Sequence, residues 1–200
     1  MLRCRGKKLK GAPYRPWNDL NVLRTHVVSS EYELFDRPSK LKVRGTYIPI
    51  TWYNDMKYLC GLYNTPFRIL DSQNMIYADT TGEYDGKEVH LRRTKTWRGG
   101  RMTNRMCLVI FFHELSHRIQ SIVGERLDWE GGPETWPERL SFERAACDLS
   151  YYLWKIYLPS KKIVHAAFRA YRSKEEVEFL RDWFDSCKNG EYPFVRREDW

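Results

Sequence analysis

The residues best suited to chemistry are His113, Glu114 and His117, which form an H-E-x-x-H pattern in a chain of 200 residues. On a helix, residues four apart lie one turn apart on the same face, so the two imidazoles can bind one metal ion together. Glu114 projects about 100° away from His113, where its carboxylate can act on a metal-bound water without being a ligand. Two neutral imidazoles and one carboxylate leave a fourth tetrahedral position open for water, which favours zinc. The pattern therefore predicts a catalytic Zn2+ site.

The segment around this pattern predicts one helix over residues 106–123, with Thr103 or Asn104 capping its start and Gly124 ending it. Its apolar residues surround nearly the whole helix axis: Met106, Leu108, Val109, Ile110, Phe111, Phe112, Leu115, Ile119, Ile122 and Val123. Such a helix is buried inside a domain. Histidines and a glutamate on a buried helix need polar partners, and a metal ion would supply them.

An open zinc site needs a third protein ligand, and the next histidine, His165, lies 48 residues beyond His117. Carboxylates of the following segment are therefore the candidates: Asp128, Glu130, Glu134, Glu138, Glu143 and Asp148. Glu143 is favoured because it borders the apolar stripe of a predicted helix over 140–158, where an unpaired carboxylate is costly to bury. Asp148 remains the rival third ligand.

The rest of the chain predicts a small sheet in the middle and helices around it. Strands are expected at 67–70, 75–79 and 88–92, the last with one solvent-exposed face, and turns at 71–74 and 81–86. Residues 41–52 are β-rich, but Pro49 restricts them to an edge strand or a broken one. Helices are expected at 18–28, 55–63, 140–158, 160–171 and 173–187, and a loop at 93–104. The predicted fold class is α+β, with a small antiparallel or mixed sheet packed on a buried H-E-x-x-H helix and a helical C-terminal half.

Length and composition indicate one domain over residues 18–200, preceded by a basic irregular arm over residues 1–17. Hydrophobic residues make up 42% of the chain and aromatic residues 15%, which excludes a disordered protein. No apolar run approaches the roughly 18 residues that a membrane helix needs, and the N-terminus lacks the apolar stretch of a secretory signal. The five cysteines are odd in number and widely spread, which suits a reducing compartment. We therefore expect a soluble, cytoplasmic protein with no membrane partner.

The net charge of +8 is concentrated in two segments. Residues 1–18 and 91–112 contain no acidic residue but twelve basic ones: Arg3, Arg5, Lys7, Lys8, Lys10, Arg15, Arg92, Arg93, Lys95, Arg98, Arg101 and Arg105. Without these twelve, 22 basic residues stand against 26 acidic ones, so the rest of the chain is net −4. A solvated loop explains either segment, but nucleic acid or another acidic partner could also bind there.

The motif and its spacing resemble the gluzincin type of zinc metallopeptidase. The H-E-L-S-H pattern is followed, 26 positions after its last histidine, by Glu143 within Glu-Arg-Ala-Ala-Cys-Asp. This arrangement is similar to the ImmA/IrrE-like branch, and the resemblance covers roughly residues 67–158. It implies a zincin-like fold, a protein or peptide substrate, and an edge strand over 87–92 that lies along the bound peptide. The zinc ligands that it implies are His113, His117 and Glu143.

One position departs from the thermolysin-like pattern. There, an aspartate four residues after the ligand glutamate orients a zinc-bound histidine. Here Cys147 occupies that position and Asp148 follows it. The resemblance therefore does not fix the residues around the ligands, and Asp148 stays open as the third ligand.

The mechanism that the resemblance implies is hydrolysis in which zinc polarises the scissile carbonyl and lowers the pKa of its water towards about 7. Glu114 takes the proton of that water and later passes it to the leaving amine. The residue that stabilises the oxyanion is open: Tyr151, Tyr152 or His165. Two other hypotheses are a catalytically silent zincin-fold module that binds DNA or a protein through the basic segments, and a structural zinc site closed by Asp148 or Cys147.

Overall fold

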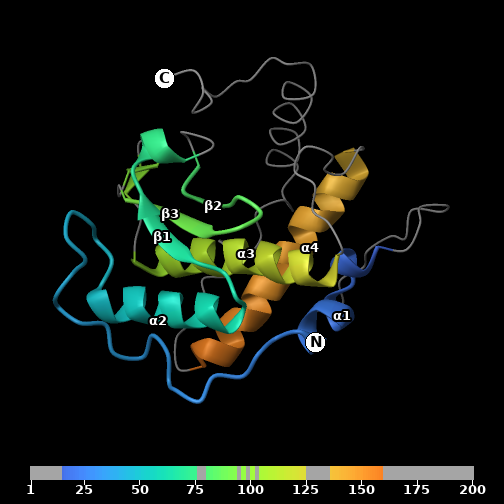
Figure 1. Ribbon diagram of the computed structural model, residues 1–200, viewed down its shortest axis with the longest axis horizontal. Helices are drawn as coiled ribbons and strands as arrows, with labels where there is room; N and C mark the ends of the chain where they lie inside the picture. The colour runs from blue at the N-terminus through green and yellow to red at the C-terminus, as the bar shows by residue number, and fades with distance from the viewer. Residues whose placement is uncertain are drawn as a thin grey trace.

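Helix α3 (Asn104–Val123) runs through the middle of the computed structural model, with the sheet on one side and helices on the other (Figure 1). The structure describes residues 15–75, 80–93, 96–97, 100–101, 104–124 and 136–159. Before α3 the chain forms η1 (Pro16–Asn18), α1 (Leu20–Thr25), α2 (Ile50–Leu62), β1 (Phe67–Leu70), η2 (Ser72–Asn74), β2 (Gly82–Tyr84), β3 (Val89–Arg92), β4 (Thr96–Trp97) and β5 (Gly100–Arg101). After α3 comes α4 (Trp136–Tyr157). The described chain is α+β, which confirms the predicted class.

Helix α3 is buried on nearly all sides, as its sequence predicts. Phe111, Phe112 and Leu115 are fully buried. Phe111 contacts Phe67 of β1 edge-to-face at a centroid distance of 5.5 Å, and Phe112 stacks on Tyr157 of α4. Burying a side chain of this size contributes about 1.5–3 kcal/mol. Helix α3 therefore holds the sheet and α4 together.

The sheet has three strands in the order β1-β3-β2, with β1 parallel and β2 antiparallel to β3. Strand β3 lies in the centre, so the prediction that residues 87–92 form an edge strand is wrong. Strand β2 lies at one edge of the described sheet, although residues 81–86 predict a turn. Its three residues are all buried and pair with β3. A three-residue strand flanked by turn residues is too short to show a period in the sequence.

The predicted solvent-exposed face of β3 is also wrong at His90, which is only 6% exposed. His90 lies in a row across the sheet, opposite Arg68 of β1 and Glu83 of β2. Its Nδ1 is 3.0 Å from Glu83 Oε1 and its Nε2 is 3.2 Å from Glu88 Oε2. Burial alone would lower the pKa of His90, but these carboxylates outweigh it and raise the pKa. The buried histidine is thus satisfied by an ion-pair network within the sheet.

Helix boundaries differ from the predicted ones where proline is involved. Helix α2 begins at Ile50, directly after Pro49, and not at residue 55. The β-rich segment 41–52 forms only one isolated antiparallel bridge within the described chain. Helix α4 begins at Trp136, with Pro137 in its first turn. Proline is tolerated there because the first N–H groups of a helix have no helical partner.

Several predicted elements are shorter in the structure or lie outside the described residues. The helix expected at 18–28 is shorter and forms α1, whose first turn Asp19 caps by accepting a hydrogen bond from the backbone N–H of Asn21. Residues 1–14 and 76–79 lie outside the described residues, as do the helices expected at 160–171 and 173–187. In the part of the chain that the structure describes, no helix is both long and apolar enough to cross a membrane.

Gly82→Ala should lower the free energy of unfolding by about 1–3 kcal/mol, because inserting a methyl group into a packed contact forces its neighbours apart. Its Cβ would lie 2.4 Å from Cγ2 of Ile110 and 3.1 Å from Cγ of Glu114, both on α3. Gly61→Ala is the matched control, since nothing lies within 4 Å of that Cβ. In α2 the alanine should stabilise by up to about 1 kcal/mol. Urea denaturation measures both changes, and equal stability of Gly82→Ala and wild type would contradict close packing of β2 on α3.

Candidate metal centre

Three side-chain atoms from α3 and α4 converge at one point of the structure: Nε2 of His113, Nε2 of His117 and Oε2 of Glu143. The two nitrogens are 3.0 Å apart. The carboxylate oxygen lies 3.2 Å from the nitrogen of His113 and 3.3 Å from that of His117. The three atoms form a nearly equilateral triangle and could hold a metal ion. We call these three residues the His-His-Glu group.

Helical periodicity brings the two imidazoles together, and the packing of α4 on α3 adds the carboxylate. His113 and His117 lie one turn apart, with ring centroids separated by 4.6 Å. Glu143 is 8% exposed, and a buried carboxylate without partners would be costly. Here the two imidazoles face it. Asp148, the rival third ligand, is not a member of the group.

The imidazole of His117 is oriented by Gln120, which the sequence analysis does not single out. Nδ1 of His117 lies 2.8 Å from Oε1 of Gln120 and donates to it, so that Nε2 keeps its lone pair for the group. Nε2 of Gln120 donates to the backbone carbonyls of Phe142 at 2.9 Å and Trp17 at 3.1 Å. The Phe142 ring also stacks on His117. The sequence signal for Gln120 is its position three residues after a ligand on the same helix.

The imidazole of His113 contacts Cys147 on its other side. The Cys147 Sγ lies 3.6 Å from Nδ1 of His113, the ring nitrogen that does not face Glu143. The thiol is buried and is not a member of the His-His-Glu group. Cys147 therefore contacts the histidine at the position where the sequence departs from the thermolysin-like aspartate, and it does not close the site as a fourth ligand.

Glu114, the predicted general base, is buried beside the group at 8% exposure. Burial raises the pKa of Glu114 to about 7, against the lowering effect of His113. The negative charges of Glu143 and Glu83 raise this pKa further, and a hydrogen bond from the backbone N–H of Tyr84 lowers it. Because Tyr84 belongs to β2, the edge strand holds the carboxylate in place. A carboxyl group that titrates near neutral pH can both accept and return a proton.

Three residues are predicted as alternatives for stabilising an oxyanion, and the structure describes two of them, Tyr151 and Tyr152. Tyr151 and Tyr152 lie about two turns beyond Glu143 on α4, and each packs beneath a cationic side chain. His165 lies outside the described residues.

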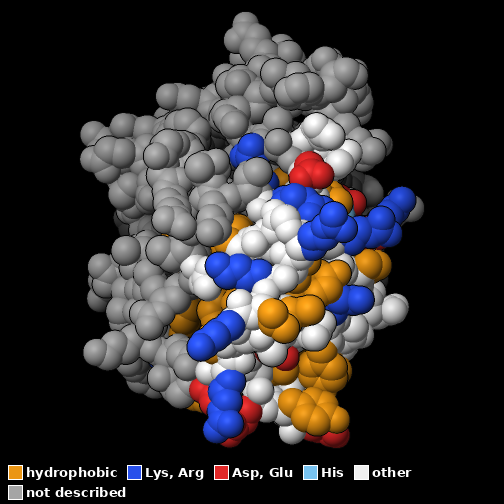
Figure 2. Space-filling view, turned by 90° about the vertical axis from the view of Figure 1, so that its left-hand side faces the viewer, with side chains coloured by type: hydrophobic (Ala, Val, Ile, Leu, Met, Phe, Trp, Pro, Cys, Tyr) orange, Lys and Arg blue, Asp and Glu red, His pale blue; other side chains and the backbone are white. Residues whose placement is uncertain are grey.

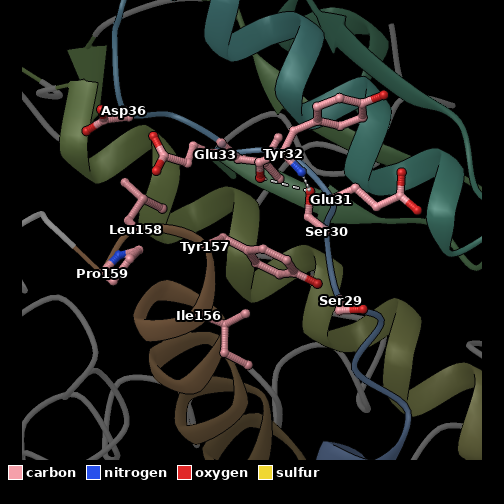
Figure 3. A pocket seen from close by; sticks show the side chains of 11 residues that line it. Ser29, Ser30, Glu31, Tyr32, Glu33, Asp36, Ile156, Tyr157, Leu158 and Pro159 are labelled. Atoms are coloured by element: carbon pink, nitrogen blue, oxygen red, sulfur yellow. Dashed lines mark hydrogen bonds between the residues drawn. The ribbon is translucent and has the colours of Figure 1, made fainter.

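A hollow of about 370 Å³ lies elsewhere, between residues 29–36 and the C-terminal end of α4 (Figure 3). Three carboxylates line it, those of Glu31, Glu33 and Asp36, together with apolar side chains. Among the described residues that line the hollow there is no histidine or cysteine, and no member of the His-His-Glu group. The His-His-Glu group is therefore separate from this hollow.

The basic segment over residues 1–18 lies largely outside the described residues, whereas the segment over residues 91–112 is described at 91–93, 96–97, 100–101 and 104–112. In the second segment, Arg93 forms an ion pair with Asp71 at 2.8 Å. The structure shows a further basic segment over residues 37–44, which contains no acidic residue. Its exposed basic residues are Arg37, Lys40, Lys42 and Arg44. Figure 2 shows Lys and Arg side chains interspersed with apolar ones on the face that includes this segment.

No known protein family, curated protein or solved structure matches this chain. The resemblance to gluzincins is thus carried by the motif and its spacing alone. The functional argument rests on the geometry of the His-His-Glu group and on Glu114 beside it.

Glu143→Ala should lose far more zinc than Asp148→Ala, because only Glu143 places an oxygen in the triangle. Loss of a ligand weakens metal binding by more than the roughly 10–100-fold that is typical of losing a residue that orients a ligand, whereas Asp148 lies outside the group. Metal content of the purified variants, measured by mass spectrometry, tests this. Full zinc retention in Glu143→Ala would contradict the assignment.

In zinc-free protein, Glu114 should make stability depend on pH. An unfolded glutamate ionises near pH 4.5, whereas folded Glu114 stays protonated up to about pH 7. As the pH rises from 4.5 to 7, the raised pKa therefore lowers the free energy of unfolding by about 3 kcal/mol in total. Above pH 7 it causes no further loss. The unfolding free energy of Glu114→Gln minus that of wild type, measured with chelator present, should grow from pH 4.5 to 7 and then level off. A constant difference would contradict the raised pKa.

Proposed function

We propose that this protein is a zinc-dependent peptidase in which Glu114 acts as the general base. The observation that carries the proposal is the convergence of one oxygen and two imidazole nitrogens within 3.0–3.3 Å of one another. Glu114 is buried directly beside this group. A metal-binding group adjoining a carboxyl group of raised pKa is an arrangement suited to hydrolysis.

The donor atoms and their spacing favour zinc as the metal. Zinc in proteins binds imidazole and carboxylate with bonds of about 2.0–2.2 Å. In a tetrahedral site such bonds place the ligand atoms about 3.3–3.5 Å apart, close to the three distances of the His-His-Glu group. Magnesium and calcium prefer oxygen ligands, so the two imidazoles argue against both.

The site is proposed to be open and therefore catalytic. Among the described residues, no fourth histidine, cysteine, aspartate or glutamate joins the group. A zinc ion with three protein ligands keeps a position for water or substrate, polarises a carbonyl and lowers the pKa of its water to about 7. A closed structural site would have no use for a proton acceptor at Glu114.

The role proposed for Glu114 is proton transfer between the attacking water and the leaving amine. In the metal-free protein, burial raises the pKa of this carboxyl group to about 7, so it exchanges protons near neutral pH. The backbone N–H of Tyr84 holds the carboxylate, so that the proton acceptor is fixed before substrate binds.

We propose that the peptide substrate lies along β2, which is next to this base and at one edge of the sheet that the described residues form. An edge strand can pair with an extended peptide through its backbone groups. The N–H of Tyr84 is directed at Glu114, so the edge of β2 adjoins the reacting groups. An extended peptide paired with β2 would therefore pass beside the His-His-Glu group.

The second candidate function is a catalytically silent module that binds nucleic acid or an acidic protein. The observation in its favour is the exposed basic segment over residues 37–44, in addition to the basic residues near the N-terminus and before α3. This function makes no use of Glu114, so the two candidates differ in what they require of that residue.

Purified protein should contain one zinc ion per chain, and zinc should raise its melting temperature. A ligand that binds only the folded state stabilises it by about 2.7 kcal/mol when present at 100 times its dissociation constant. Chelator should reverse the rise, and His113→Ala should abolish it. A melting temperature that ignores both zinc and chelator would remove the basis of the zinc proposal.

Glu114→Gln should retain zinc and fold but lose peptide cleavage by about 10²–10⁴-fold, because glutamine cannot accept the proton. New peptide termini in the proteome of cells that express each variant provide the measurement. Asp148→Asn, which neutralises a carboxylate outside the group, is the matched control and should cleave like wild type. Identical terminus profiles for wild type and Glu114→Gln, with zinc in both, would favour the binding module.

A further inference from the structure

We infer that Gln120 couples the N-terminal turn η1 to the metal centre, so that docking of this turn and zinc affinity depend on each other. The inference rests on the proposed zinc site but not on peptidase activity. It concerns a residue that touches no substrate and acts by positioning His117.

The side-chain amide of Gln120 is fully buried and is used at both ends. Its nitrogen lies within hydrogen-bond distance of two backbone carbonyls, those of Trp17 and Phe142. Carbonyls only accept hydrogen bonds, so this end of the amide must be the nitrogen and the oxygen must face His117. That oxygen accepts from Nδ1 of His117 at 2.8 Å, which fixes the ring and leaves Nε2 free to bind a metal.

The carbonyl of Trp17 is brought to Gln120 by tertiary packing alone, since the two residues are 103 positions apart. The indole of Trp17 packs on the end of α3: a Cβ added to Gly124 would lie 2.7 Å from its Cε3. Glycine at this position thus permits the close approach of η1. Turn η1 therefore holds one of the two carbonyls that orient the Gln120 amide.

A glutamate or a hydrophobic residue could not replace this amide. Glutamate would place a carboxylate oxygen against the two carbonyl oxygens, and a hydrophobic side chain would leave Nδ1 of His117 without an acceptor. Both halves of the amide are therefore needed for one chain of hydrogen bonds from η1 to His117. A role in packing alone would require only the volume of the side chain.

Energetic coupling between two sites is reciprocal. If a docked η1 helps to hold the His117 ring for zinc, then bound zinc must favour the docked η1 by the same factor. The two backbone amides that close the turn provide a probe, because Asn18 donates to the carbonyl of Arg15 at 3.0 Å and Asp19 to that of Pro16 at 3.1 Å. Their exchange with solvent reports whether η1 is docked and folded.

The first measurement is zinc affinity, obtained by competition with a chromophoric chelator. Gln120→Met keeps the side-chain volume but loses every hydrogen bond, so we expect affinity to fall about 10–100-fold. Gly124→Ala displaces Trp17 but leaves the carbonyl of Phe142 in place, so it should weaken binding less. Ile122→Ala, an exposed position on the same helix, is the matched control and should bind like wild type.

The second measurement is hydrogen exchange with and without zinc. Zinc should slow exchange at Asn18 and Asp19 in wild type, and this protection should be lost in Gln120→Met. Wild-type zinc affinity in Gln120→Met, or full zinc protection of η1 in that variant, would overturn the coupling. If Gln120→Met does not fold, unchanged affinity in Gly124→Ala overturns it instead. A wild-type protein that binds no zinc would overturn both the metal centre and the coupling.

Discussion

Ionisable groups are costly to bury unless each one has a partner, and the centre of this protein is organised by that requirement. His117 and Glu143 are buried where α4 packs on α3, and Glu114 is buried where β2 packs on α3. Each has contacts that offset the lost hydration: the imidazoles and Glu143 face one another, and the backbone N–H of Tyr84 binds Glu114. Two imidazole nitrogens and one carboxylate oxygen this close together could hold a metal ion. A bound ion would give each of these buried polar atoms a further partner.

The surroundings of the group come from parts of the chain that are distant in sequence. Strand β2 contacts Glu114, and α4 supplies both Glu143 and the thiol beside His113. The N-terminal turn reaches the same place through Gln120. Residues that orient the ligands of a metal site affect its affinity, although less than the ligands do, so these long-range contacts would influence how the group holds a metal ion.

The burial of Glu114 has a chemical consequence as well as a cost. In the metal-free protein, removal from water raises its pKa to about 7, so the carboxyl group takes up and releases a proton near neutral pH. The same burial destabilises the ionised form of the folded protein. Stability and proposed function therefore make opposite demands on this residue.

Much of the local structure could be predicted because it follows from periodic patterns. The buried helix over 106–123 is apparent from apolar residues on all its sides, and the spacing of four residues between His113 and His117 places both on one face. The favoured carboxylate, Glu143, is apparent from its position on an apolar stripe. Strands β1 and β3 are long enough to show in the sequence, whereas the three residues of β2 are not.

The sequence by itself determined which residues could bind a metal and that their helix is buried, because both depend on neighbours within about one helical turn. Only the tertiary structure decided that the oxygen of Glu143 joins the two imidazoles, since this depends on how α4 crosses α3. The tertiary structure alone also showed β2 as the edge beside Glu114, and Gln120 as the link to Trp17. These contacts join residues from tens to about a hundred positions apart, and periodic patterns in the sequence do not predict contacts over such separations.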